Sequence, residues 1–538
     1  MSAQPTRRTP LLVVVVAVLA ALLAVPAAQA EAPATPAPSS SAQARQALAE
    51  AQSILRGGTG VLARGTAASA ASGGEGGDAT LALRDLVLLK GQLRGADRQA
   101  AERLLARPTN GNKDPQGDGY SVPEATPVCS DEVCVHYVAS TNDKPSLRDT
   151  SPANGIPDYV ETTLATLTSV HNTYVDAGYR EPKGDGSRGG GSNLMDIYLS
   201  DIGDAGLYGY CTTDDKTAFK APWSRSAYCV LDDDYATNEF GTNTPLENLQ
   251  VTAAHEYFHA VQYAYDFKED SWLLEATATW AEDQLFDGVN DNVQYLRYSP
   301  LTRPRLPMDS SDGGFFYGTW IFFRYLTERF PAQEGGLPTL VRDIWRKADG
   351  TTGAPDQYSW QAVASVLRGR KTTAAKAFTA FSEANRRPAS TYAEGSANRY
   401  PRARLADSFT LGVRGVSQQV RLPHLTSATY RLSPGGALRA QAYRLRLRLD
   451  LAPTFRGSSA IVTVYTTSGD VRRNVIKLRK DGNATKVVPF SKATVRQIEV
   501  TLVNASGRYD CFVRGGYSCQ GESRDDRQLQ RFTARAFR

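Results

Sequence analysis

The pattern of apolar and polar positions changes twice along the chain and predicts three regions. In the first, residues 44–105 form two helical stretches around a glycine-rich gap at residues 73–78. The second stretch, residues 81–105, places leucine and alanine at helical spacing. The segment 31–107 is equally compatible with a helical pro-region that precedes a catalytic domain and with a solvated helical spacer.

The middle region, residues 108–400, contains short alternating runs early on and longer runs at helical spacing later. The predicted strands are 133–139, 193–200 and 227–231. The predicted helices are 157–178, 245–266, 271–286, 314–330, 337–347 and 358–383. Strands that precede a series of helices in this way favour an α+β domain.

The last region, residues 405–538, consists of short β-rich runs between turn signals. The predicted strands are 443–450, 459–466, 471–478, 484–489 and 495–503. This spacing predicts a small β-sandwich, and residues 509–518 are expected to form a hairpin or loop closed by cysteines.

The N-terminus has the features of a secretory signal peptide. Arg7 and Arg8 precede an apolar run, Leu11–Val25, and the small-residue site Ala28-Gln29-Ala30 follows. We therefore expect residues 1–30 to be removed by cleavage after Ala30. The apolar run is shorter than the roughly 20 residues that a membrane span requires, so no stable span is expected after cleavage.

Composition and charge exclude several classes of protein. The chain has 538 residues, of which 41% are hydrophobic and 22% charged, which is typical of a globular protein. Its formal net charge of +5 is too small and too dispersed to predict a nucleic-acid partner. All six cysteines follow the predicted signal peptide, in three near pairs: 129/134, 211/229 and 511/519. Disulfides are expected, although six cysteines allow about 15 connectivities.

The strongest chemical signal is His255-Glu256-Tyr257-Phe258-His259, an H-E-x-x-H motif. Residues i and i+4 share one face of a helix, so both histidines can direct a ring nitrogen at one zinc ion while Glu256 lies beside it. The preceding Thr244-Pro245-Leu246-Glu247 has the pattern of a capping box with proline at the first helical position.

A third ligand is expected from the next helix. The metzincin continuation of the motif is absent, because Gln262 and Tyr265 stand where glycine and histidine belong. Glu275 lies among tryptophan, leucine and alanine, which predicts burial, and coordination of a metal would resolve the high energy of a buried carboxylate. Glu282 lies two turns further on the same face.

The helix HEYFH followed by WLLEATATWAE resembles the gluzincin metallopeptidases, the group of thermolysin and aminopeptidase N. The resemblance implies that Glu275 is the third zinc ligand and Glu282 a supporting carboxylate behind it. This chain departs from the aminopeptidases in having fifteen residues rather than eighteen between His259 and Glu275, and Ala276 in place of glycine.

A wider pattern, over about 108–340, is similar to a group of secreted bacterial proteins regarded as metalloproteases. It comprises RPTNG, NGIPDYVE, HEYFHAVQYAYD and FFYGTWIFFRYL. The G-x-M-E-N motif of aminopeptidases is missing, which favours an endopeptidase. Tyr317, in the last of these segments, is the candidate donor to the oxyanion of the transition state. The strand at 227–231 is expected to present an edge on which a peptide substrate pairs.

Weaker signals concern other ions and histidines. With Gly155 at the sixth position of a calcium loop, Asn154, Asp158 and Glu161 fall where ligands belong, so Ca²⁺ is a second candidate ion. The run Asp232–Asp234 is another candidate ion site, although a solvated turn is the favoured interpretation. His136 and His171 are interpreted as structural histidines.

Together these observations predict a secreted zinc peptidase that acts on a peptide or protein substrate. Its zincin-like α+β domain lies between the helical pro-region and a C-terminal β-sandwich. Zinc on His255, His259 and Glu275 activates water, and Glu256 serves as general base. The alternative is a non-catalytic exported binding protein whose sandwich attaches to a surface or glycan. Glu256 favours the enzyme, because a purely structural metal site has no use for a base beside the ion.

Overall fold

The computed structural model describes seven stretches of the chain: residues 39–56, 79–109, 119–189, 191–241, 243–311, 314–440 and 442–538. The predicted signal peptide at residues 1–30, most of the leader after it and the glycine-rich gap at 73–78 lie outside these residues. The described part is a mixed α+β structure with several separate sheets, as the sequence predicts.

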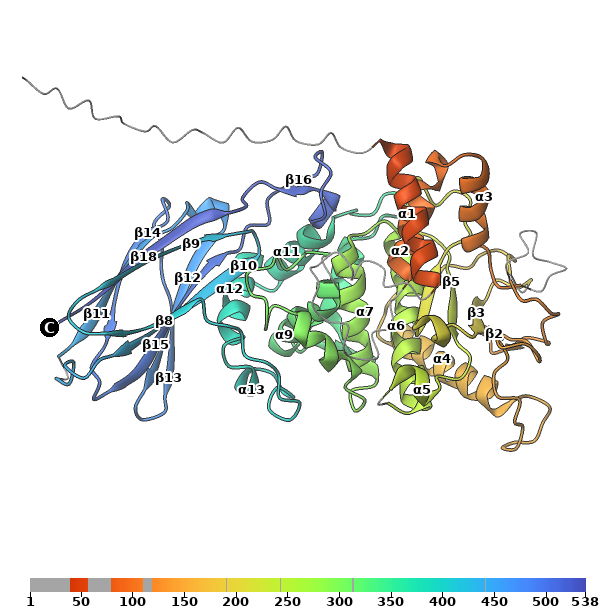
Figure 1. Ribbon diagram of the computed structural model, residues 1–538, viewed down its shortest axis with the longest axis horizontal. Helices are drawn as coiled ribbons and strands as arrows, with labels where there is room; N and C mark the ends of the chain where they lie inside the picture. Colours follow the sequence, from red (N-terminus) through yellow and green to blue (C-terminus); the bar gives the residue numbers. More distant parts are fainter. Residues whose placement is uncertain are drawn as a thin grey trace, which may run out of the picture. The chain divides into compact units, whose positions relative to one another are not determined.

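Three helices form the N-terminal region (Figure 1): α1 Ser40–Leu55, α2 Thr80–Leu89 and α3 Gly95–Leu104. The stretch predicted at 81–105 is divided by a single 3-10 turn, Lys90–Gln92, into α2 and α3. Among the leucines and alanines of this stretch, Leu83, Leu86, Leu93 and Ala101 are buried, Leu89, Ala100 and Leu104 are half-buried, and Ala96 is exposed. α2 is therefore packed into the core, whereas α3 buries only Ala101, and both interpretations of the segment 31–107 stay predictions.

The central sheet has the strand order β1-β2-β3-β5-β4. Its strands are β1 Val128–Cys129, β2 Val133–His136, β3 Met195–Ser200, β4 Gly209–Thr212 and β5 Tyr228–Asp232. β2, β3 and β5 are parallel, whereas β4 runs antiparallel to β5 at the edge of the sheet. The prediction that residues 227–231 present an edge is wrong, because β5 is paired on both sides. The edge strand is β4, which periodicity could not reveal, since its four residues are all buried.

The helices that follow pack against this sheet and against one another. Those of the central region are α4 Asp158–Asp176, α5 Thr237–Phe240, α6 Pro245–Asp266, α7 Ser271–Leu285, α8 Phe315–Gly318, α9 Trp320–Arg329, α10 Thr339–Lys347, α11 Ser359–Gly369, α12 Ala374–Ala384 and α13 Pro388–Thr391. The predicted helix 358–383 is two helices, because Lys371 between them adopts a left-handed φ of 61°. α6 and α7 lie side by side in the interior, with nearly every residue buried.

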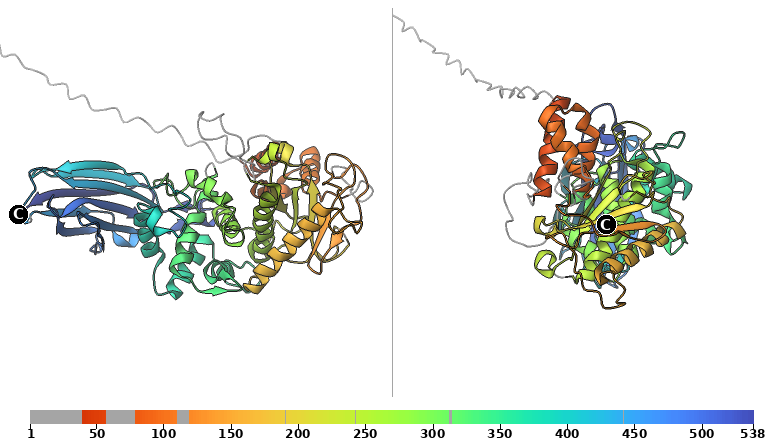
Figure 2. Two further views of the ribbon diagram at one scale, coloured as in Figure 1. Left: turned by 90° about the horizontal axis from the view of Figure 1, so that it is seen from below. Right: turned by 90° about the vertical axis from the view of Figure 1, so that its right-hand side faces the viewer.

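The C-terminal strands form two sheets in separate layers (Figure 2). The first contains β8 Asp407–Leu411, β10 Thr426–Pro434, β12 Ser458–Thr466, β13 Val471–Val475 and β15 Val495–Asn504; the second contains β9 Val416–Leu422, β11 Arg444–Asp450, β14 Asn483–Pro489 and β18 Gln528–Phe537. Alternate residues of both sheets share one hydrophobic core, and Tyr430 packs on Phe532 across it at 5.0 Å between ring centroids. The five predicted strands are present. The sequence does not predict four further strands: β8, β9, β10 and β18.

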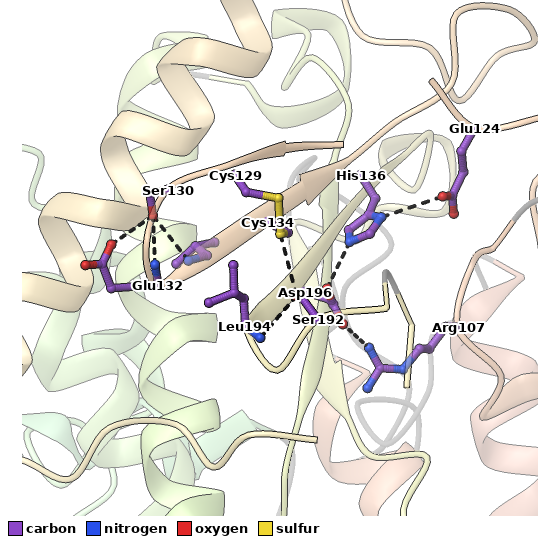
Figure 3. Close-up of a disulfide and its surroundings, with 11 residues drawn as sticks. Arg107, Glu124, Cys129, Ser130, Glu132, Cys134, His136, Ser192, Leu194 and Asp196 are labelled. Carbon is purple, nitrogen blue, oxygen red and sulfur yellow. Dashed lines mark hydrogen bonds and ion pairs between the residues drawn. A yellow bond between two sulfur atoms is a disulfide. The ribbon is translucent and has the colours of Figure 1, made fainter. Parts of the chain in front are cut away.

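All six cysteines are paired in disulfides: Cys129–Cys134, Cys211–Cys229 and Cys511–Cys519. The first joins β1 to β2 (Figure 3), and the second joins the edge strand β4 to β5. Three disulfides are compatible with an exported protein. Among the residues that the structure describes, no helix is both long and apolar enough to cross a membrane.

A buried ion pair connects the sandwich to the central region. His424, between β9 and β10, lies 2.9 Å from Asp309 Oδ1 through its Nε2 atom and 2.5 Å from Asp526 Oδ1 through its Nδ1 atom. The other oxygen of Asp309 accepts hydrogen bonds from Tyr509 and Ser518 of the C-terminal region. The two carboxylates raise the pKa of His424 from its ordinary 6.5 to about 9, although burial opposes the shift.

The raised pKa of His424 predicts a pH-dependent stability. The protonated imidazole is favoured by folding, so its contribution is complete below pH 6.5 and is lost as the pH rises through 9. We expect the free energy of unfolding to fall by about 3 kcal/mol over this interval, at roughly 1.4 kcal/mol per pKa unit. Urea unfolding at pH 6 and pH 9.5 measures it. His424→Gln, measured in parallel, isolates this residue: an equally steep fall in the variant would contradict the assignment.

Candidate metal centre

The motif H-E-x-x-H lies on α6, and the local sequence explains why a helix begins where it does. The Thr244 side chain accepts a hydrogen bond from the backbone N–H of Glu247, whose carboxylate in turn accepts one from the backbone N–H of Thr244. Pro245 occupies the first helical turn. The capping box fixes the start of α6 and thereby the face that His255 and His259 share.

The two histidines and Glu275 converge from neighbouring helices. Glu275 Oε2 lies 3.3 Å from His255 Nε2 and 3.6 Å from His259 Nε2. Ligands about 2.0–2.1 Å from a tetrahedral zinc ion stand about 3.3–3.4 Å from one another. Both distances from Glu275 are thus close to those in a tetrahedral zinc site. The ligand atoms of the three residues all lie within 4.8 Å of one another, and the three side chains are buried.

Glu275 has the environment of a metal ligand. Its side chain is fully buried, and neither carboxylate oxygen accepts a hydrogen bond from any residue that the structure describes. A buried carboxylate without donors is strongly destabilised, whereas a divalent cation between it and the two imidazoles would neutralise it. The donor set of two imidazoles and one carboxylate also matches the preference of zinc.

Further side chains orient the histidines. His255 Nδ1 is 2.5 Å from Glu282 Oε1, and His259 Nδ1 is 2.7 Å from Gln262 Oε1. Gln262 is itself held by hydrogen bonds from its Nε2 atom to the carbonyl of Leu274 and the hydroxyl of Thr277. Both imidazoles therefore direct Nε2 towards Glu275. Burial raises the pKa of Glu282 to about 7.

The sequence predicts a supporting role for Glu282 but none for Gln262. Its spacing of three residues from His259 on a helix was a usable signal for this role.

Replacing Glu282 tests the orienting role. Glu282→Gln keeps the size of the side chain but removes the anionic acceptor behind His255, and we expect zinc affinity to fall about 10- to 100-fold. Competition with a chromogenic chelator measures the change. Glu522→Gln, at an exposed position in the C-terminal region, serves as the control and should bind zinc like the wild type. An unchanged affinity in Glu282→Gln would contradict the role.

Glu256 faces a small cavity next to the three ligands. The cavity is about 40 Å³ and is lined by both α6 and β4, together with Tyr295 and Tyr317. Glu256 is 3% exposed. β4 can pass this close only because position 209 is glycine: a Cβ atom there would lie 2.8 Å from Glu256 Cγ.

Tyr317, the predicted hydrogen-bond donor to the oxyanion of the transition state, lies beside this cavity. Its ring is 6.3 Å from that of His255 and stacks on Tyr295 at 5.0 Å between centroids. The structure thus brings His255, Glu256, His259, Glu275, Glu282 and Tyr317 together. A cavity of this size holds one or two water molecules.

The candidate calcium residues are engaged in hydrogen bonds where a turn enters α4: Asn154 lies in the turn, and Asp158 and Glu161 lie in the first turn of the helix. Asp158 accepts hydrogen bonds from the backbone N–H groups of Thr150 and Ser151, and Asn154 donates one to Glu161 Oε1. These bonds account for the three side chains without an ion. Calcium at this loop stays a prediction.

A second group of carboxylates lies at the end of β5. Asp232 and Asp233 are buried, so the prediction of a solvated turn is wrong for these two residues. Burial raises the pKa of Asp232 to about 6 and that of Asp233 to about 8. With Asp201 they form a cluster that could hold a cation. The turn prediction failed because Asp232 is the last residue of an interior strand.

The remaining histidines of the central region have ordinary structural partners. His136 Nε2 lies 2.9 Å from Asp196 Oδ1, and Arg107 pairs with the other carboxylate oxygen of Asp196 (Figure 3). His171 Nδ1 lies 2.7 Å from the hydroxyl of Tyr257. These two contacts support the interpretation of His136 and His171 as structural residues.

Comparison with known proteins yields no family model and no curated protein that matches this chain.

Proposed function

We propose that the protein is a zinc-dependent peptidase, an endopeptidase of zincin-like fold that acts outside the cell. The observation that carries the proposal is Glu275, a fully buried carboxylate that accepts no hydrogen bond from any described residue and lies 3.3 and 3.6 Å from the Nε2 atoms of two imidazoles. A second carboxylate, Glu256, faces the same cavity. A structural metal site has no need of that second group, whereas hydrolysis requires a base.

The residues of the centre have distinct roles in peptide hydrolysis. His255, His259 and Glu275 would hold the zinc ion, which when bound supplies Lewis-acid polarisation of the scissile carbonyl and of a water molecule. Glu256 takes a proton from the attacking water and returns it to the leaving amine. Tyr317 donates a hydrogen bond to the oxygen that gains negative charge. Glu282 and Gln262 keep the imidazoles in place.

The proposal is tested by the new termini that the protein generates. The full-length protein, loaded with zinc, is incubated with a diverse peptide library, and products are identified by mass spectrometry. We expect internal cleavages that disappear on chelation and are absent with Glu256→Gln. Identical product lists from the native and variant proteins, both as unmodified chains and with Arg84 of α2 replaced by alanine, would overturn the proposal and favour the alternative, an exported binding protein whose sandwich contacts a surface or glycan.

A further inference from the structure

The N-terminal helix α2 begins at the metal centre. Thr80, its first residue, is fully buried, and its hydroxyl donates a hydrogen bond to Glu256 Oε2 at 3.3 Å. The same hydroxyl accepts a hydrogen bond of 2.9 Å from the backbone N–H of Cys211. One side chain of α2 therefore joins the proposed catalytic base to the edge strand β4.

This contact lies at the unpaired edge of the sheet, formed by β4. β4 is paired with β5 on one side only, and Cys211 lies within it. The backbone N–H of Cys211 points away from β5 and is satisfied by Thr80. A main-chain donor at a sheet edge is what an extended peptide would use, and here α2 has taken it.

Two buried arginines also bind the N-terminal segment to residues of the central region. Arg84, one turn into α2, donates to the carbonyl of Glu269 and to the hydroxyl of Ser271, both at 2.9 Å. Arg107, after α3, forms ion pairs with three carboxylates: Asp185, Asp196 and Asp214.

The space left beside Glu256 is too small for a substrate. The cavity of about 40 Å³ compares with roughly 300 Å³ or more for a typical ligand pocket. On the side of β4, the hydroxyl of Thr80 lies between the carboxylate of Glu256 and the backbone N–H of Cys211, so a peptide could pair with β4 beside Glu256 only if α2 moved.

We propose that α2 is an autoinhibitory element, and that the chain with α2 in place is a latent form of the enzyme. The inference rests on the proposed function. Displacement of α2 frees both the carboxylate of Glu256 and the backbone N–H of Cys211. The segment 31–107 is then a pro-region rather than a spacer.

Two variants of the full-length protein test the proposal. Arg84→Ala removes the bonds to Glu269 and Ser271 and should release α2, so we expect zinc-dependent peptide cleavage to rise at least tenfold. Thr80→Val keeps the volume of the side chain but removes its hydroxyl, and a rise of about threefold is expected. Arg98→Ala, which removes a surface ion pair with Glu102 on α3, is the control and should cleave at the wild-type rate.

Hydrogen exchange provides a second measurement on the same proteins. The amide of Cys211 should exchange at least tenfold faster in both variants than in the wild type and the control, provided that the near-ultraviolet circular dichroism shows a native fold. Cleavage by the wild type at the rate of folded variants, with unchanged exchange, overturns autoinhibition and leaves the peptidase intact. Absence of zinc-dependent cleavage in every protein overturns the proposed function and this inference with it.

Discussion

Replacing Glu256 by glutamine is expected to lower peptide cleavage by a factor of about 100 to 10,000 without loss of zinc. The amide has the shape of the carboxylate but cannot accept a proton, and general-base catalysis contributes a factor of this order. Because Glu256 is not one of the three converging ligands, zinc affinity should stay within about twofold. Both quantities can be measured on one preparation, in the wild-type chain and in the Arg84→Ala background.

The matched control for this substitution is Glu522→Gln, an exposed glutamate on β17 Glu522–Ser523 in the C-terminal region. It should leave cleavage and zinc affinity at wild-type values. If Glu256→Gln kept more than a tenth of the wild-type rate, Glu256 would not be the base.

Replacing Glu275 by glutamine is expected to abolish the stabilisation of the protein by zinc. For the wild type, zinc at 100 times its dissociation constant should add about 3 kcal/mol to the free energy of unfolding. The variant should show the same stability with zinc and with a chelator. It should be no less stable than the metal-free wild type, because glutamine removes a buried charge that no hydrogen-bond donor supports.

Glu499 offers a contrasting control. It is also a buried glutamate, but Arg386 and Arg431 pair with it at 2.9 and 3.0 Å. Glu499→Gln should therefore lower stability by about 3–5 kcal/mol, equally with and without zinc. A zinc-dependent shift that survives in Glu275→Gln would contradict the role of Glu275 as ligand.

The sequence predicted the parts of the centre that depend on local spacing. His255 and His259 are one helical turn apart, and the capping residues before them mark where α6 begins. Glu275 was identifiable because its apolar neighbours imply burial. In these cases the relevant geometry is contained within two consecutive helices.

Features that depend on contacts between distant segments could not be predicted. The edge strand β4 is four buried residues without alternation, so β5 was taken for the edge instead. The contact of Thr80 with Glu256 joins residues 176 positions apart, and nothing in the periodicity of α2 distinguishes a helix that covers an active centre from one that covers any other surface. The burial of Asp232 likewise follows from the neighbours of β5 in the sheet.

The most direct test of the central claim, a catalytic zinc site on α6 and α7, is crystallography of the zinc-loaded protein at wavelengths on both sides of the zinc absorption edge. We expect one strong anomalous peak that vanishes at X-ray energies below the edge. It should lie about 2.0–2.1 Å from Nε2 of His255 and of His259 and should be coordinated by Glu275. A map with no zinc between these residues, or with zinc bound only at the Asp232 cluster, would contradict it.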